Sequence, residues 1–140
     1  MSRSTTAGSK LEMSKSMSSL PQSNISHFQA GVDTLKRARK GEKRIQSALE
    51  RAHKLYNCGQ YKEALASCEE SYEIDAFRTD NLLLLGAIHF QLRNFSECIF
   101  YNQQCIRVDP TYAEAFSNLG NALKELGDIQ AAIQFYMKVR

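Results

Sequence analysis

Apolar and small residues recur along this chain at a regular spacing of about 34 residues, from Ile45 to the C-terminus. Three sets of equivalent positions carry the pattern: Tyr61, Phe95 and Ile129; Ala64, Cys98 and Ala132; and Ala52, Gly86 and Gly120. Between them the apolar residues follow the period of about 3.6 that is typical of helices. Small residues allow two antiparallel helices to approach closely where they cross. The pattern therefore predicts consecutive helical hairpins, each leaving an apolar flank for the next hairpin to cover.

The expected repeats are residues 45–78, 79–112 and 113–140, the last of them truncated. The expected helices cover about residues 45–57, 61–74, 80–92, 95–108 and 113–126, followed by a final helix that Asp128 caps. A period of about 34 residues with small residues at these offsets is the signature of tetratricopeptide repeats. We therefore predict an all-α fold: a right-handed superhelical solenoid of about three tetratricopeptide repeats, preceded by a disordered tail.

The N-terminal segment differs in composition from the repeats. Residues 1–27 are rich in serine and poor in large apolar residues, so burial cannot offset the entropy of ordering them, and we expect a disordered tail. Residues 28–44 form a basic lead-in with apolar residues at helical spacing, interrupted by Gly31. The run from Lys36 to Arg44 resembles a nuclear localisation patch. The alternative is a solvated basic face that leads into the first repeat.

The distribution of charged and apolar residues argues against nucleic acid and membranes as partners. Residues 1–44 carry nine Lys/Arg against three Asp/Glu, whereas residues 45–140 carry nine against twelve. A basic tail can contact phosphates, but no aromatic residues interleave with it and the repeats are acidic, which speaks against nucleic acid. No run of 18 apolar residues exists, so we expect no membrane contact. The N-terminus lacks the apolar core of a signal peptide, which predicts a cytoplasmic or nuclear location.

The residue pattern indicates no catalytic or metal site. The four cysteines include no C-x-x-C pair and no paired Cys/His set, so we predict no metal site. No histidine has a Ser or Cys at the spacing of a triad, and no glycine-rich phosphate loop is present. We therefore expect no catalytic, cofactor-binding or metal-ligating residue within these 140 residues.

The candidate binding surface is the first helix of each repeat, helix A, which lines the concave side of stacked hairpins. The candidate partner-binding residues are His53, Tyr56, Asn57, Asp80, Phe90, Gln91, Asn118, Asn121 and Lys124. The wider set on the same face is Gln46, Leu49, Glu50, Leu83, Leu84, Ala87, Glu114, Ser117 and Glu125. Amide side chains can bind a peptide backbone without reading its sequence, so this surface suits an extended peptide segment. The alternative for any single residue is that it is merely solvated.

Several segments resemble the N-terminal tetratricopeptide region of protein O-GlcNAc transferases. They are Arg78–Leu92 (RTDNLLLLGAIHFQL), Ala52–Tyr56, Gly59–Leu65 and Ser117–Asp128, and the resemblance covers about residues 45–140. It implies a superhelix that selects substrates for a glycosyltransferase region, which transfers N-acetylglucosamine from UDP-GlcNAc to Ser/Thr of nuclear and cytosolic proteins. It also implies a ladder of asparagines that holds the substrate backbone. Asn118 matches this ladder, whereas Glu50 and Leu84 break it.

Two functions follow from this interpretation. The first is the substrate- and partner-recognition part of a protein O-GlcNAc transferase, whose full-length form is a glycosyltransferase with UDP-GlcNAc as donor, while this chain holds no catalytic region. The alternative is a stand-alone adapter or scaffold without catalytic activity. Repeat position 5 is Leu49, Leu83 and Ser117, so the Lys/Asn clamp of chaperone adapters is not built. The uncovered apolar end of the third repeat predicts a fragment of a longer array, or a broken gene model, that self-associates through its repeats.

Overall fold

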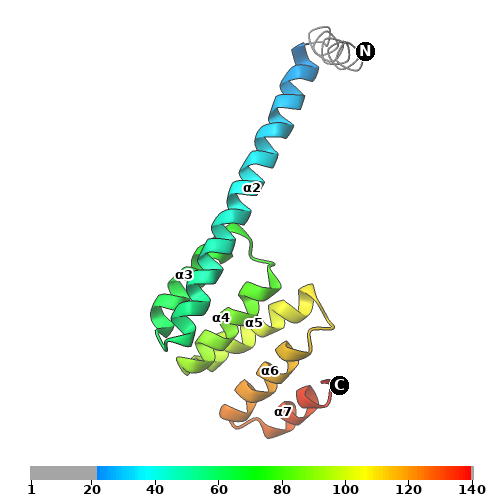
Figure 1. Cartoon of the computed structure of the whole chain (residues 1–140). Coiled ribbons are helices and arrows are strands. Elements are labelled where there is room, and N and C mark those ends of the chain that lie inside the picture. The colour runs from blue at the N-terminus through cyan, green and yellow to red at the C-terminus, as the bar shows by residue number, and fades with distance from the viewer. Residues whose placement is uncertain (1–21, 140) are drawn as a thin grey trace, which may run out of the picture. The chain divides into compact units, whose positions relative to one another are not determined.

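The computed structural model describes residues 22–139, and all regular structure in that range is helical. The helices are α2 (Gln22–Asn57), α3 (Tyr61–Ile74), α4 (Thr79–Gln91), α5 (Phe95–Val108), α6 (Ala113–Glu125) and α7 (Ile129–Tyr136). Their order along the chain is shown by colour in Figure 1. The all-α prediction is confirmed, and the bounds of α3 and α5 equal the predicted ones.

The chain divides into two units, residues 1–40 and residues 41–140. The described part of the first unit is the stretch of α2 up to Lys40, whose apolar side chains Phe28 and Leu35 are exposed. Most of the expected tail, residues 1–21, lies outside the described residues, and the helix begins at residue 22 rather than near 28. It also continues through Gly31, because extending an existing helix costs far less than nucleating one.

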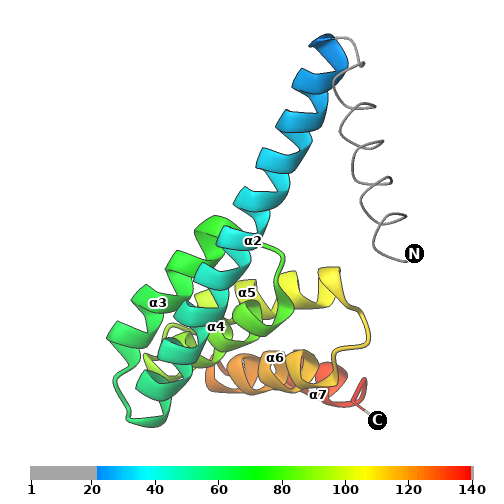
Figure 2. The same ribbon diagram turned by 45° about the horizontal axis from the view of Figure 1, so that its top comes forward.

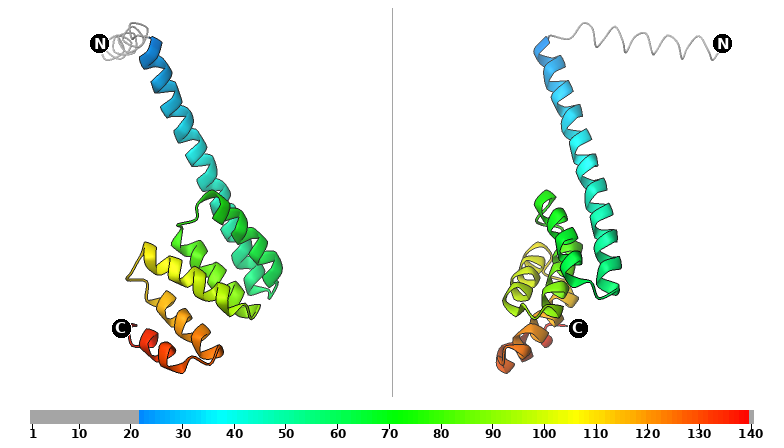
Figure 3. Two further views of the ribbon diagram at one scale, coloured as in Figure 1. Left: turned by 180° about the vertical axis from the view of Figure 1, so that it is seen from behind. Right: turned by 90° about the vertical axis from the view of Figure 1, so that its left-hand side faces the viewer.

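The second unit consists of three antiparallel hairpins. The part of α2 from Gly41 pairs with α3, and the pairs α4/α5 and α6/α7 follow, with contacts between each helix and the next from α3 to α7. Figure 2 shows α4 and α5 beside α6 and α7, and the two further views in Figure 3 show the hairpins following one another in chain order. In each hairpin the first helix is helix A and the second is helix B.

Small residues lie where the two helices of a hairpin cross. Ala52 and Ala64 are fully buried in the first hairpin, and Cys98 is 1% exposed in the second. A Cβ atom added at Gly86 would lie 3.1 Å from Cγ of Asn102 and closer still to its amide nitrogen. A Cβ atom at Gly120 would lie 2.6 Å from the ring of Tyr136. The repeating pattern of small residues therefore marks real close approaches between helices.

The buried core runs from hairpin to hairpin. One cluster joins α2, α3 and α4 and includes Ile45, Leu49, Cys68, Leu84, Leu85 and Ile88. A second cluster joins α4, α5 and α6 through Leu82, Cys105 and Ala115. Because each cluster takes residues from two successive hairpins, no hairpin has a complete core of its own, as expected of a solenoid.

The turn inside each hairpin has one conformation. The residue at the turn has a positive φ in all three hairpins: 76° at Gly59, 63° at Arg93 and 87° at Gly127. The next backbone N–H in each turn donates to the carbonyl five residues earlier, which closes the end of helix A. Asp128 then accepts a hydrogen bond from the backbone N–H of Ala131 at 3.2 Å, as predicted for a helix cap. Arg93 is the exception, because side-chain-bearing residues rarely adopt this conformation.

The two flanks of the second unit differ in polarity. In the first hairpin, Arg51 takes the place of the buried Leu85 and Leu119, and it bonds Ser67 and Glu70 at 3.0 and 2.9 Å. Ile133 on α7 and Met137 at its C-cap are 47% and 71% exposed. Within residues 22–139, no helix is long and apolar enough to cross a membrane.

Candidate binding groove

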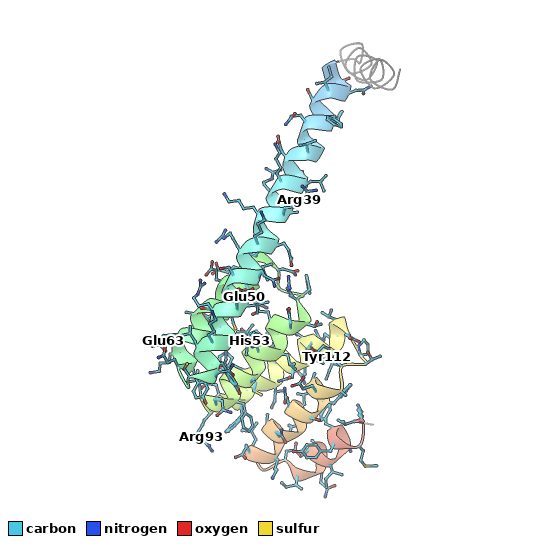
Figure 4. The ribbon with its side chains drawn as sticks, in the orientation of Figure 1. Arg39, Glu50, His53, Glu63, Arg93 and Tyr112 are labelled. Atoms are coloured by element: carbon cyan, nitrogen blue, oxygen red, sulfur yellow. The ribbon has the colours of Figure 1, made fainter. Side chains whose placement is uncertain are left out.

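A hollow of about 340 Å³ runs across the helix A face of all three hairpins. It is lined by His53, Tyr56 and Asn57 of α2, by Asp80, Leu83, Leu84 and Ala87 of α4, and by Glu114 and Asn118 of α6. We call it the acidic hollow, because two carboxylates line it and no Lys or Arg is among its described lining residues. His53 is labelled in Figure 4 on the stretch of α2 near α4.

A second hollow of about 210 Å³ adjoins the first. Its lining residues are Tyr56, Gly86, Ala87, Phe90, Gln91, Cys98, Asn118 and Asn121. We call it the aromatic hollow. Its two rings are held in place by edge-on contacts, Tyr56 with Tyr61 and Phe90 with Phe95, each with ring centroids 5.4 Å apart. Since Tyr56, Ala87 and Asn118 line both hollows, the two form one groove.

The groove brings together eight of the nine candidate residues. Only Lys124, on the last turn of α6, lines neither hollow. In the wider set, Leu49 lines neither hollow and packs in the core cluster, so its expected place in the groove was wrong. Glu50 lies in a separate depression with Arg51 and Lys54. Gln46 of α2, and Ser117 and Glu125 of α6, also line neither hollow.

The groove also uses residues that the sequence did not indicate. Gly86 and Cys98 line the aromatic hollow, because a small helix crossing leaves space on the groove side. Asn102 lies beneath it, fully buried on helix B. The only sequence signal for Asn102 is a polar side chain at the position where the neighbouring repeats have Cys68 and Tyr136.

The charge of Asp80 is partly balanced. Nε of Arg78 lies 3.0 Å from Oδ1 of Asp80, and the same guanidinium also bonds Glu42. These hydrogen bonds raise the pKa of Arg78 above its usual range, and the bond to Asp80 contributes more than the bond to Glu42. Oδ1 of Asp80 also accepts the backbone N–H of Asn81 at 2.8 Å. Glu114 adds a second carboxylate to the same hollow.

Hydrogen bonds hold two groove asparagines of α6. Nδ2 of Asn118 donates to Oδ1 of Asn102 at 3.4 Å, and Nδ2 of Asn102 donates to the carbonyl of Cys98 at 2.8 Å. The hydroxyl of Tyr136 donates to Oδ1 of Asn121 at 2.6 Å. Amide groups whose orientation is fixed in this way can offer a peptide backbone a defined donor or acceptor.

The buried cysteines and His89 have pKa values that fit packing rather than chemistry. Burial raises the pKa of the Cys68 thiol to about 12, and those of Cys98 and Cys105 to about 11. Thiols with such pKa values are not nucleophilic at neutral pH. His89 stacks on Tyr101 with ring centroids 5.4 Å apart, and burial lowers its pKa. The described residues contain no group of three or more His, Cys, Asp or Glu that could hold a metal ion.

Hairpins of this length, with small residues at the crossings and a shared turn, define a tetratricopeptide-repeat solenoid. Family models described as tetratricopeptide repeats match residues 79–112 and 101–134. Two curated relatives extend the match. The chain is 44% identical over 86 residues to a probable UDP-N-acetylglucosamine–peptide N-acetylglucosaminyltransferase of Arabidopsis thaliana, which covers 61% of this chain and 9% of the relative. It is 39% identical over 88 residues to the enzyme of Caenorhabditis elegans, covering 63% and 8%.

Solved structures agree with the fold. The second tetratricopeptide domain of Spaghetti, bound to an HSP90 peptide, matches with a TM-score of 0.69 at 20% identity over 74% of this chain and 95% of that one. An O-GlcNAc transferase of Thermobaculum terrenum matches with a TM-score of 0.67 at 23% identity over 71% of this chain and 19% of that one. The chain is thus homologous to the repeats of O-GlcNAc transferases, and it spans less than a tenth of the length of the curated relatives it matches.

Proposed function

We propose that the groove binds extended segments of other proteins, and that it serves as the recognition part of a protein O-GlcNAc transferase. The observation that carries the proposal is the continuous groove over three helix A surfaces, with aromatic walls and amides held in defined orientations. The repeats at residues 45–78, 79–112 and 113–140 form the binding unit, and residues 1–44 precede it. The binding residues are His53, Tyr56, Asn57, Asp80, Phe90, Gln91, Asn118 and Asn121, and Lys124 in the last turn of α6 is a further candidate.

Peptide binding in the groove requires no catalytic step from this chain. UDP-GlcNAc is the donor substrate of the full-length enzyme, and the groove does not fit a diphosphate, because carboxylates and no Lys or Arg are among its described lining residues. The same charge argues against an acidic peptide such as the one bound to Spaghetti. The cytoplasm and the nucleus are the compartments that fit this role, with the basic residues from Lys36 to Arg44 as the candidate nuclear signal.

The binding test uses a randomised library of decapeptides with acetylated N-termini and amidated C-termini. Peptides selected by the whole chain should bind Asn118→Ala about 5- to 30-fold more weakly, since a lost hydrogen bond and its unpaired partner cost about 1–2 kcal/mol. Gln103→Ala, which removes an exposed amide from α5 outside both hollows, should bind as the unchanged protein does. A library that yields no binder, or equal binding by both variants, would refute a peptide groove.

The enzyme assignment needs a separate measurement. Sequencing the transcript beyond codon 140 shows whether the frame continues through further repeats into a glycosyltransferase region. If it does, deletion of residues 45–140 from that product should lower N-acetylglucosamine transfer from UDP-GlcNAc to protein substrates, while hydrolysis of UDP-GlcNAc persists. A stop codon at this point in every transcript would favour the adapter function.

A further inference from the structure

Asn102 has an orientation that its buried surroundings dictate. Its side chain is completely buried on α5, and Nδ2 donates to the backbone carbonyl of Cys98 at 2.8 Å. A carbonyl oxygen can only accept a hydrogen bond, so the amide nitrogen of Asn102 must face Cys98. Oδ1 of Asn102 then faces the opposite way, toward α6.

This orientation is transmitted to the groove. Oδ1 of Asn102 can only accept, and Nδ2 of Asn118 donates to it at 3.4 Å. The nitrogen of the Asn118 amide is thereby turned inward, and its Oδ1 is left on the side of the groove, where Asn118 lines both hollows. The backbone of α5 therefore fixes, through one buried amide, which atom the groove residue presents.

The preceding hairpin interface has the same two positions filled by apolar residues. Cys68 takes the place of Asn102 one repeat earlier in the chain, and Leu84 takes the place of Asn118. Cys68 is fully buried and Leu84 is 6% exposed, and both belong to one core cluster. The two interfaces thus match in polarity within each pair: thiol with aliphatic side chain, and amide with amide.

We propose that Asn102 is a positioning residue that holds Asn118 as a hydrogen-bond acceptor for one backbone N–H of the bound segment. The inference rests on the proposed peptide-binding function and adds the residue that controls it. Asn102 does not touch the ligand, because it is fully buried. The pair of residues at these two repeat positions determines whether an interface offers the ligand an acceptor or an apolar surface.

The first test needs no ligand. Side-chain amide resonances of Asn118 in the ¹⁵N-labelled whole chain should show one protected and one freely exchanging Nδ2 proton. In Asn102→Cys this difference should disappear, because the acceptor is gone. Asn81→Cys is the matched control: Asn81 is also a buried amide, and it donates to the carbonyl of Cys68 at 3.0 Å, but it lines neither hollow. Unchanged Asn118 resonances in Asn102→Cys would overturn the proposal.

The second test uses a decapeptide selected from the randomised library and methylated at one backbone nitrogen at a time. At one position, methylation should weaken binding to the unchanged chain by about ten-fold more than to Asn102→Cys, since only the oriented Asn118 uses that N–H. The double variant Asn102→Cys/Asn118→Leu copies the Cys68/Leu84 pair and should restore the melting temperature without restoring this sensitivity. An equal methylation penalty in all variants would refute the positioning role.

The two tests separate the inference from the proposed function. If no library peptide binds the unchanged chain, the peptide groove is refuted, and with it the acceptor role toward a ligand. The amide resonances then still decide whether Asn102 orients Asn118. If peptides bind and the Asn118 amide behaves alike in the unchanged chain and in Asn102→Cys, the groove stands and the positioning role is wrong.

Discussion

The close contact between Gly86 of α4 and Asn102 of α5 offers a quantitative test of the fold. Gly86→Ala adds one Cβ atom that would lie 3.1 Å from Cγ of Asn102, and closer to its Nδ2. The amide cannot move away freely, because Nδ2 is bonded to the carbonyl of Cys98 within a fully buried site. The substitution must therefore displace Asn102 or spread α4 from α5.

The expected change in the free energy of unfolding is the balance between a gain in helix propensity and the costs of overpacking and of a lost hydrogen bond. Alanine in place of glycine within a helix gains about 1 kcal/mol from propensity. Overpacking costs about 1–3 kcal/mol, and displacing the buried amide from its carbonyl partner costs a further ~1–3 kcal/mol. We expect a net destabilisation of about 3 kcal/mol, the midpoint of a range of about 1–5 kcal/mol, which corresponds to a fall in melting temperature of roughly 12–24 °C for a unit of about 100 residues.

The assay is thermal unfolding followed by circular dichroism on the whole chain. Gly31→Ala is the matched control, because it lies within α2 and a Cβ there would meet nothing within 4 Å. It should leave the melting temperature unchanged or slightly higher. Adding Asn102→Ser to Gly86→Ala should recover part of the loss, because serine lacks the atoms that clash. A melting temperature of Gly86→Ala at or above that of the unchanged chain would show that the helix crossing is not close-packed.

Three further predictions concern other parts of the repeats. Burial lowers the pKa of His89 below its ordinary value of 6.5, so the unfolded chain binds more protons than the folded chain. The free energy of unfolding should therefore be highest above about pH 6.5 and should fall as the pH decreases below it. In His89→Phe the melting temperature should depend less on pH. In a thiol titration of the native chain with an aromatic disulfide, Cys58 alone should react rapidly, since the other three thiols are buried; four fast thiols would contradict the core. Arg93→Gly should stabilise by about 1 kcal/mol in denaturant unfolding, because relief of the positive φ of 63° exceeds the lost contact with Phe95; a destabilised variant would contradict this reasoning.

The helices and their pairing could be predicted from the sequence, because they depend on features with a fixed period. The regular repeat spacing and the small residues at the crossings placed α3 and α5 at their observed bounds. The positive φ at Arg93 could not be predicted from the sequence, because the hairpin imposes this conformation on a residue that disfavours it. The groove was mostly predictable, since helix periodicity decides which side chains share a face. Asn102 was not, because its role depends on a contact between two different hairpins.

The α2 flank is polar and the α7 flank is apolar, so we expect a further helix to pack against the α7 flank and not against the α2 flank. At the α2 flank, the guanidinium of Arg51 is half exposed and bonded to Glu70, so a hydrophobic partner there would bury charge without a new compensating pair. At the α7 flank, Ile129, Ile133 and Met137 follow one another at intervals of four residues and are 47–71% exposed. Helical residues at that spacing share one face, so a further helix gains from apolar burial on this side only. We therefore expect a neighbour that packs as another hairpin does to approach α7.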